Sequence, residues 1–214
     1  MVNRMNKEQG KTMLKHFLSV FVFAAGVCAF SAEPANLVRN GQFLETKSKI
    51  AGVPDGKLPD PWYVQGGIKK LPEGCGVSTT EKPAGYQGNS YVITGRCLLT
   101  QSTLAVTPGK TYRTSCKVKT KKTSPSAQIR LQVIWLDKNW REIIKIEKGT
   151  KMWDHQWTWV RSAPEWKELV IPAFKAPANA KYAKIRFGND NTKEGFAWFA
   201  DFKMTEVASP EKAE

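Results

Sequence analysis

The chain has 214 residues, of which 41% are hydrophobic and 24% charged, and its formal net charge is +14 at pH 7. This composition is typical of a globular domain and excludes disordered and fibrous chains. A positive charge of this size is compatible with nucleic acid, anionic polysaccharide or a phosphate-bearing surface as a partner, so the charge alone selects none of them.

The N-terminal part reads as a targeting segment. Residues 17–30 are the apolar run FLSVFVFAAGVCAF, which follows basic residues such as Lys15. A run of this length behind positive charge is typical of a signal peptide and is short for a membrane span. We expect residues 1–31 to be a signal peptide that begins at Met1 or Met13. Its removal takes away four basic residues and one acidic residue, which lowers the net charge from +14 to +11.

A signal peptide places the protein outside the cytoplasm. We expect a bacterial protein that is secreted or held in the periplasm or cell envelope, and export argues against nucleic acid as the partner. Attachment to the membrane is expected only if Cys28 is a lipidation site, and Val27 fits poorly before a lipidated cysteine.

Three cysteines remain after export. In an oxidising compartment this number predicts one disulfide and one free thiol. Cys75 and Cys97 flank a turn-rich segment, so we expect them to form the disulfide. Cys116 alternates with Tyr112, Thr114 and Val118 and is expected at a buried strand position. A zinc site is disfavoured because the cysteine spacings are long.

From residue 33 onward, short apolar runs alternate with turn signals. We expect one domain over 33–206 and a polar tail over 207–214. Residues 69–76 and 149–154 are expected as loops. The strands are expected at residues 36–38, 62–64, 90–94, 97–101, 111–119, 128–136, 140–146, 157–161, 166–172, 180–187 and 196–204.

The last two of these strands show a period of two, which is typical of half-buried strands. In 180–187, apolar residues alternate with Tyr182, Lys184 and Arg186. In 196–204, one face is expected to be apolar and to include Trp198, together with Phe196, Ala200, Phe202 and Met204. Such a face needs a second layer to cover it. No amphipathic helix is evident beyond the signal peptide, so the fold class is all-β, a two-sheet sandwich or jelly roll.

Four segments resemble known modules in their order and spacing. They are LVRNGQF at 37–43, TYRTSCKVK at 111–119, APANAKYAKIRF at 176–187 and FADFKM at 199–204. Together they resemble jelly-roll carbohydrate-binding modules of the galactose-binding-like superfamily, such as families four, nine, sixteen and twenty-two. The resemblance covers roughly residues 35–206 and implies a β-sandwich that binds a polysaccharide or oligosaccharide without catalysis.

The resemblance also implies a structural calcium ion held by the first and last strands. Asp201 and Glu45 are the acidic residues that this chain offers for it. Gln42 and Ala200 stand where such modules usually carry acidic residues, and a hard cation needs several oxygen ligands. The alternative is that Asp201 pairs or caps at a strand edge. No other cofactor is expected.

Aromatic side chains are the expected platforms for sugar rings, because their flat faces pack against apolar C–H groups. Trp135 and Trp198 lie on apolar strand faces and are expected in the core. Five others have loop or mixed contexts and are either platforms or packing residues: Trp62, Trp140, Trp153, Trp157 and Trp159.

Polar residues on three strands form a second candidate set. They are Arg113 and Lys117, Arg130 and Gln132, and Tyr182 and Arg186. If the three strands share a sheet, these side chains form a basic face that binds hydroxyls, carboxylates or sulfates. The alternative is an ordinary solvated face.

The leading hypothesis is therefore a monomeric module that binds a neutral or anionic glycan. The competing hypothesis is an envelope structural or protein-interaction domain with the same fold. An enzyme is not expected, because no nucleophile motif and no opposed pair of carboxylates stands out.

Overall fold

The computed structural model describes residues 34–46, 58–65, 71–190 and 194–209. The expected signal peptide and residues 210–214 of the tail lie outside these ranges. The described residues form twelve strands and no α-helix. This part of the chain therefore contains no helix that could span a membrane. The all-β prediction is confirmed.

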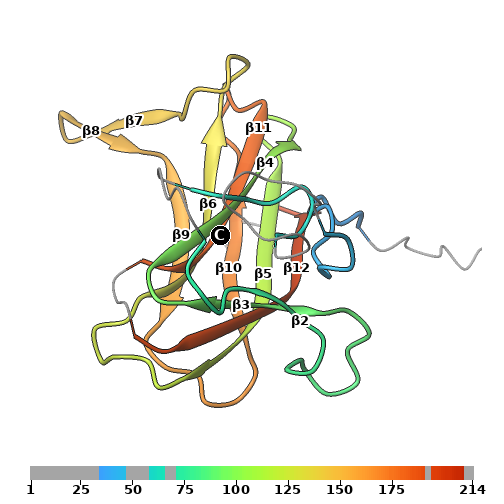
Figure 1. Ribbon diagram of the computed structural model, residues 1–214. Helices are drawn as coiled ribbons and strands as arrows, with labels where there is room; N and C mark the ends of the chain where they lie inside the picture. Colours follow the sequence, from blue (N-terminus) through green and yellow to red (C-terminus); the bar gives the residue numbers. More distant parts are fainter. Residues whose placement is uncertain (1–33, 47–57, 66–70, 191–193, 210–214) are drawn as a thin grey trace, which may run out of the picture. The chain divides into compact units, whose positions relative to one another are not determined.

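Ten strands form two antiparallel sheets that pack face to face (Figure 1). The first sheet has the order β1-β4-β11-β6-β9, with bounds Tyr63–Val64, Cys97–Ala105, Tyr182–Asn189, Ile129–Leu136 and His155–Val160. The second sheet has the order β10-β5-β12-β3-β2, with bounds Lys167–Lys175, Thr111–Lys121, Phe196–Val207, Ser90–Thr94 and Gly76–Ser78.

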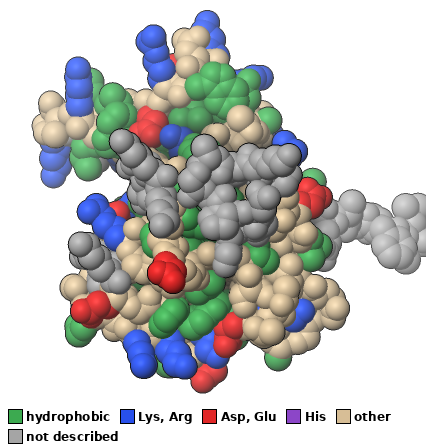
Figure 2. All heavy atoms as spheres, in the orientation of Figure 1, with side chains coloured by type: hydrophobic (Ala, Val, Ile, Leu, Met, Phe, Trp, Pro, Cys, Tyr) green, Lys and Arg blue, Asp and Glu red, His purple; other side chains and the backbone are tan. Residues whose placement is uncertain are grey.

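The remaining two strands, β7 (Ile144–Glu147) and β8 (Thr150–Trp153), form a separate hairpin. It projects beyond the ends of β6 and β9 (Figure 1). Ile144, Ile146 and Met152 are exposed on it. Figure 2 shows hydrophobic and basic side chains interspersed over this hairpin, at the upper left.

The core lies between the two sheets and is rich in aromatic rings. Phe187 of the first sheet and Phe202 of the second have ring centroids 4.5 Å apart. Trp62 lies against both, at 5.0 Å and 5.2 Å, and is fully buried. Burial of such large side chains supplies the main stabilisation of a two-layer fold.

A β-bulge changes the pattern expected for the last strand. The register of β12 on β5 shifts between Ala200 and Lys203, and Asp201 has a positive φ of 54°. Where two residues of one strand lie opposite a single residue of the partner strand, the side chains that follow point to the other side of the sheet. Phe202 and Met204 therefore face the core, whereas Trp198 faces outward and is only partly buried. The expectation that Trp198 belongs to the core is wrong.

Other boundaries differ in small ways. The segment expected as a first strand is not a regular strand, although Leu37 N–H donates to the Met204 carbonyl at 2.8 Å. The Asn36 side chain makes the neighbouring hydrogen bonds to β12: it accepts from Met204 N–H and donates to the Phe202 carbonyl. Strands β2 and β8 lie within or beside segments expected as loops.

The expected disulfide is absent. Cys75, Cys97 and Cys116 are buried, and none of them forms a disulfide. The Cys75 and Cys97 side chains lie together, and their hydrogen bond, with burial, raises the pKa of Cys97. The Cys75 sulfur also accepts from Thr94 N–H at 3.2 Å. The two thiols are thus neighbours that share a hydrogen bond and no covalent bond.

Candidate functional site

Ring-bearing side chains follow one another along the edge of the first sheet. Trp153 ends β8, and His155, Trp157 and Trp159 occupy every second position of β9, so they point to the same side. We call these four residues the aromatic row. The Trp153 and His155 rings are stacked, with centroids 6.0 Å apart and an interplanar angle of 15°. Arg161 continues the row with its guanidinium 5.3 Å from the Trp159 ring.

The aromatic row is accessible to solvent. Trp153 is 54% exposed and Trp157 is 53% exposed. Large aromatic side chains are usually more deeply buried, and grouped exposed ones mark interaction surfaces. Because β9 is an edge strand, the first sheet covers the row from one side only.

Polar side chains of β6 and β11 lie beside the row on the same face. Gln132 is directly opposite Trp157, and Arg130 is opposite Trp159. Arg186 on β11 is opposite Gln132. Directly opposite residues of an antiparallel pair share a face and lie about 5 Å apart. Rings and polar groups therefore form parallel rows on the outer face of the first sheet.

A hydrogen-bonded chain orders these polar groups. Arg186 Nη1 donates to Gln132 Oε1 at 3.3 Å, and Gln132 Nε2 donates to His155 Nδ1 at 2.8 Å. This arrangement uses Nδ1 of His155 as the acceptor, so its proton is on Nε2. Burial, opposed in part by Glu142, lowers the pKa of His155. The imidazole is therefore neutral at pH 7.

Glu142 closes one end of this polar arrangement. Its carboxylate lies 2.9 Å from Lys184 Nζ and 3.8 Å from His155 Nε2. Burial alone would raise the pKa of Glu142, but the hydrogen bond and charge of Lys184, with the charges of His155 and Arg186, lower it. Glu142 is thus a charged carboxylate held by Lys184.

Asp190 closes the other end. It lies 2.8 Å from Arg130 Nη1 and 3.8 Å from Arg96 Nη2. Arg186 forms no ion pair with any carboxylate that the structure describes, and its Nε is buried without a hydrogen-bond partner. Burial lowers the pKa of both Arg130 and Arg186, although both guanidinium groups remain charged.

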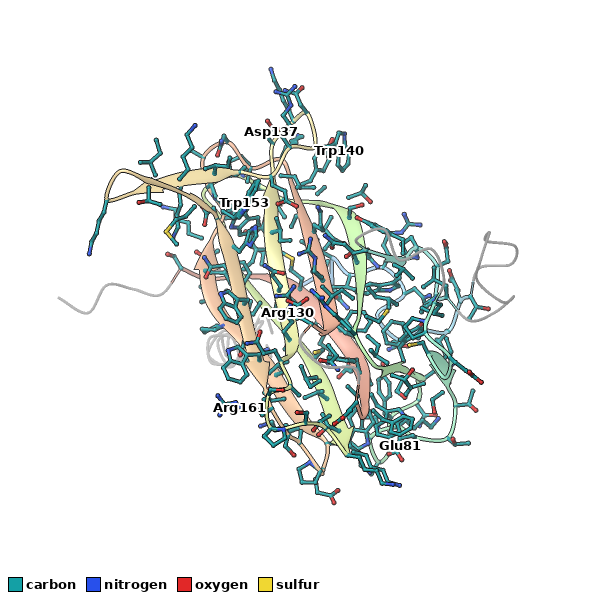
Figure 3. All side chains as sticks on the ribbon, turned by 60° about the vertical axis from the view of Figure 1, so that its left-hand side comes forward. Glu81, Arg130, Asp137, Trp140, Trp153 and Arg161 are labelled. Carbon is teal, nitrogen blue, oxygen red and sulfur yellow. The ribbon has the colours of Figure 1, made fainter. Side chains whose placement is uncertain are left out.

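Trp140 stacks on the end of the same face. Its ring lies 3.9 Å from that of Tyr182 with an interplanar angle of 8°, and it is 47% exposed. The hairpin turn that carries it is held by Asp137, whose carboxylate accepts from Asn139 and Arg141 N–H. Trp140 and Trp153 lie at one end of the first sheet, Arg161 lies toward the other, and Arg130 lies between (Figure 3).

The structure thus brings together most of the residues singled out from the sequence, with three exceptions. Trp62 is fully buried and cannot touch a ligand, because the core aromatic rings enclose it. Arg113 and Lys117 lie on β5 in the second sheet, so the expected continuous basic face does not exist. The three strands alternate alike in sequence, but β5 packs on the opposite layer.

The residues expected to hold calcium have other partners. The Asp201 carboxylate lies 3.1 Å from Lys203 Nζ, and Asp201 N–H donates to the Tyr86 hydroxyl. The Glu45 carbonyl accepts from the Asn40 side chain at 2.7 Å. No group of three or more His, Cys, Asp or Glu side chains in the described ranges could hold a metal ion. Calcium binding therefore stays a prediction, and we assign no chemistry to it here.

Sequence reasoning missed several residues of the face. A lone histidine in an aromatic run is usually a packing or hydrogen-bonding residue, although the alternation of His155 with Trp157 and Trp159 could have placed it in the row. Glu142 and Asp190 lie outside β6 and β11, and no local pattern indicates that their carboxylates approach the basic residues of these strands.

The sequence matches no protein-family model and no curated protein. Similar folds are found among solved structures. The enzymatically active domain of tailspike protein 4 from bacteriophage CBA120 matches with 14% identity and a TM-score of 0.53, over 80% of this chain and 21% of that chain. This chain thus spans about a fifth of the length of the tailspike chain.

Carbohydrate-binding modules are also among the similar structures. The CBM22-1 xylan-binding domain of Paenibacillus barcinonensis Xyn10C has 17% identity and a TM-score of 0.48, over 82% of this chain and 97% of that chain. A CBM4 structure has 18% identity and a TM-score of 0.49, over 79% and 99%. At these identities the likeness concerns the fold alone. The described part of the chain is a two-sheet β-sandwich, as the sequence predicts.

Proposed function

We propose that this protein is an exported, non-catalytic carbohydrate-binding protein that holds a polysaccharide or oligosaccharide on the outer face of the first sheet. The observation that carries the proposal is the aromatic row, with solvent-accessible indoles at Trp153 and Trp157 beside the hydrogen-bonded groups of β6 and β11. Sugar rings have apolar C–H faces that pack on such platforms and hydroxyl edges that need polar partners.

The polar groups are suited to this role because they are already positioned. Gln132 is buried and is held between Arg186 and His155, so its side chain loses little further freedom on binding. Preorganised groups bind more tightly because the ordering cost has already been met in folding. Trp140, fixed on Tyr182, extends the aromatic surface at the end of the face.

The acidic residues of the face support binding over catalysis. Glycoside hydrolysis commonly uses two carboxyl groups, one as an acid and the other as a nucleophile or base. Glu142 and Asp190, which flank the polar groups of the face, are each engaged in ion pairs with cations. The hydrogen bond and charge of Lys184 lower the pKa of Glu142, so this carboxyl group is a poor proton donor.

Affinity electrophoresis and isothermal titration calorimetry test the proposal. The ligands are xylan, mixed-linkage β-glucan, galactan, polygalacturonate, alginate and carrageenan. We expect Trp157→Ala and Trp159→Ala each to weaken binding by about tenfold or more, which corresponds to about 1.4 kcal/mol. Trp198→Ala is the matched control, because Trp198 is a partly exposed tryptophan on the other sheet.

Two outcomes would contradict the proposal. Absence of binding to every ligand would favour the competing hypothesis of a protein-interaction domain. Binding that is weakened by Trp198→Ala and unaffected by the two β9 variants would move the site to the second sheet.

A further inference from the structure

Three arginines meet in a pocket beside the aromatic row. The pocket has a volume of about 440 Å³, and its lining includes Arg96, Arg130, Arg186, Asp190 and Gln65. Asp190 is the one carboxylate among its described lining residues. The side chains that line the pocket therefore carry an excess of positive charge.

The existing contacts leave several N–H donors of these arginines without an acceptor. Arg130 takes the close contact to Asp190, and Arg96 lies at 3.8 Å from the same carboxylate. Arg186 has a neutral acceptor, Gln132, and no described carboxylate. The Nε atoms of Arg130 and Arg186 are both buried without partners. A guanidinium group has five donors and binds oxyanions in a bidentate manner, so two of these groups have donors to spare.

The Arg130 and Arg186 guanidinium groups are partly buried, and this makes their N–H donors without an acceptor unfavourable in the protein without a ligand. Burial also lowers the pKa of each group. A charge withdrawn from water without a counter-ion is destabilised. An anion that enters the pocket would therefore gain more from Arg186 than from an exposed, already paired cation.

The position of the pocket identifies the kind of anion. Arg130 is directly opposite Trp159, and Arg186 lies one strand further from the row. Adjacent strands are about 4.8 Å apart, so Arg186 lies about 10 Å from the row. A sugar chain on the aromatic row would direct its substituents toward these guanidinium groups.

We infer that the face selects acidic glycans, and that a carboxylate or sulfate group of the sugar binds between Arg130 and Arg186. This inference rests on the proposed function, since the aromatic row holds the chain whose acidic group enters the pocket. A uronic acid and a sulfated sugar present the same oxyanion chemistry, and the experiment separates them.

The test compares ligands that differ in charge on a common backbone. Polygalacturonate is paired with its methyl ester, and carrageenan with its desulfated form. We expect the acidic member of one pair to bind at least about tenfold more tightly, the worth of one charge-assisted bidentate contact. The pair that shows the difference tells whether the group is a carboxylate or a sulfate. Equal binding of both members in both pairs would overturn the inference.

Variants assign the effect to the pocket. Arg186→Gln is expected to remove most of the preference for the acidic ligand, measured as the ratio of its affinity to that of its neutral partner. Arg113→Gln is the matched control, because it removes the same charge from a residue paired with Glu168 on the other sheet. If both variants weaken acidic binding equally, the effect is general electrostatic attraction and the inference fails.

Failure of the inference and failure of the proposed function give different results. If Trp157→Ala weakens binding of both members of a pair while Arg186→Gln has no effect, the aromatic site stands and the acidic pocket is wrong. If Trp157→Ala and Trp159→Ala bind like the unmodified protein, the proposed function itself is wrong. Thermal unfolding of each variant is measured first, and we expect Arg186→Gln to fold normally because Arg186 has no ion pair among the described residues.

Discussion

The outer faces of the two sheets both carry rows of basic side chains, but these charges are balanced differently. On the second sheet, Arg113 pairs with Glu168 and Lys119 pairs with Glu81, each at 3.1 Å. Two more one-to-one pairs lie at its margins: Lys110 with Glu206, and Lys203 with Asp201. On the first sheet, the arginines of the pocket share one described carboxylate.

This difference shows that the number of Lys and Arg residues on a strand does not identify a binding face. Exposed one-to-one pairs contribute little and leave no cation in need of a partner. Partly buried cations in excess over carboxylates keep their capacity for an external anion. The aromatic row lies beside the partly buried arginines of the first sheet, whereas the partly exposed Trp198 lies beside lysines, of which Lys119 is paired with Glu81.

The largest expected effect comes from breaking the first sheet alone. Gly188 on β11 has a φ of +139°, and a Cβ there would collide with the Cys97 carbonyl of β4. We expect Gly188→Ala to lower the free energy of unfolding by about 3 kcal/mol or more, through backbone strain and displacement of β4. Chemical denaturation measures this.

Gly85→Ala is the control for that prediction. Gly85 also has a positive φ, +73°, but a Cβ there would meet nothing within 4 Å. The expected loss is about 1–2 kcal/mol, the cost of a left-handed conformation alone. Equal losses for the two variants would show that the contact with β4 is unimportant.

A smaller effect separates the ion pairs of the two faces. Arg130→Met leaves the partly buried Asp190 with the more distant Arg96, so we expect a loss of about 1–3 kcal/mol in the free energy of unfolding. Arg113→Met breaks the exposed pair with Glu168 and should cost less than about 1 kcal/mol. Urea denaturation of both variants checks this, and the reverse order would refute the distinction between the faces.

A weaker pH dependence should arise from the first sheet. Burial lowers the pKa of His155 below its ordinary value of 6.5, and the groups that face it are Glu142, Arg186, Asp154 and Arg130. Between the two pKa values the unfolded chain binds more protons than the native protein. The free energy of unfolding therefore falls as the pH drops below 6.5.

The measurement is a series of denaturation curves between pH 7.5 and about 5.5. This range lies above the lowered pKa of Glu142, whose loss of stabilisation begins at lower pH. His155→Gln keeps a hydrogen-bonding side chain and removes the titration, so its curve should be flatter. An unchanged slope in this variant would assign the pH dependence to another group.

The smallest effect on stability is expected at Trp140. This residue has a φ of +64°, which favours glycine, but its ring stacks on Tyr182. Trp140→Gly relieves about 1–2 kcal/mol of backbone strain and loses about 0.5–1.5 kcal/mol of ring stacking. The two contributions nearly cancel, so thermal unfolding should change little. A weaker affinity for glycans at unchanged stability would add Trp140 to the binding surface.

Local patterns were sufficient for much of the site. The alternation in β6 and β11 placed Arg130, Gln132 and Arg186 outward, because side chains of a strand point alternately to its two faces. The same alternation placed Trp157 and Trp159 on one side. It failed for Trp198, since the bulge at Asp201 reverses the faces and has no distinct local signature in FADFKM.

Local periodicity and turn chemistry predict most of the strands, the two-layer architecture and the side to which most strand residues point. Contacts between distant segments set which strands share a sheet, and they separate Arg113 and Lys117 from Arg130 and Arg186. They also set which cations lie beside carboxylates. Strand order and charge pairing depend on residues far apart in the chain, and a period of two carries no information about either.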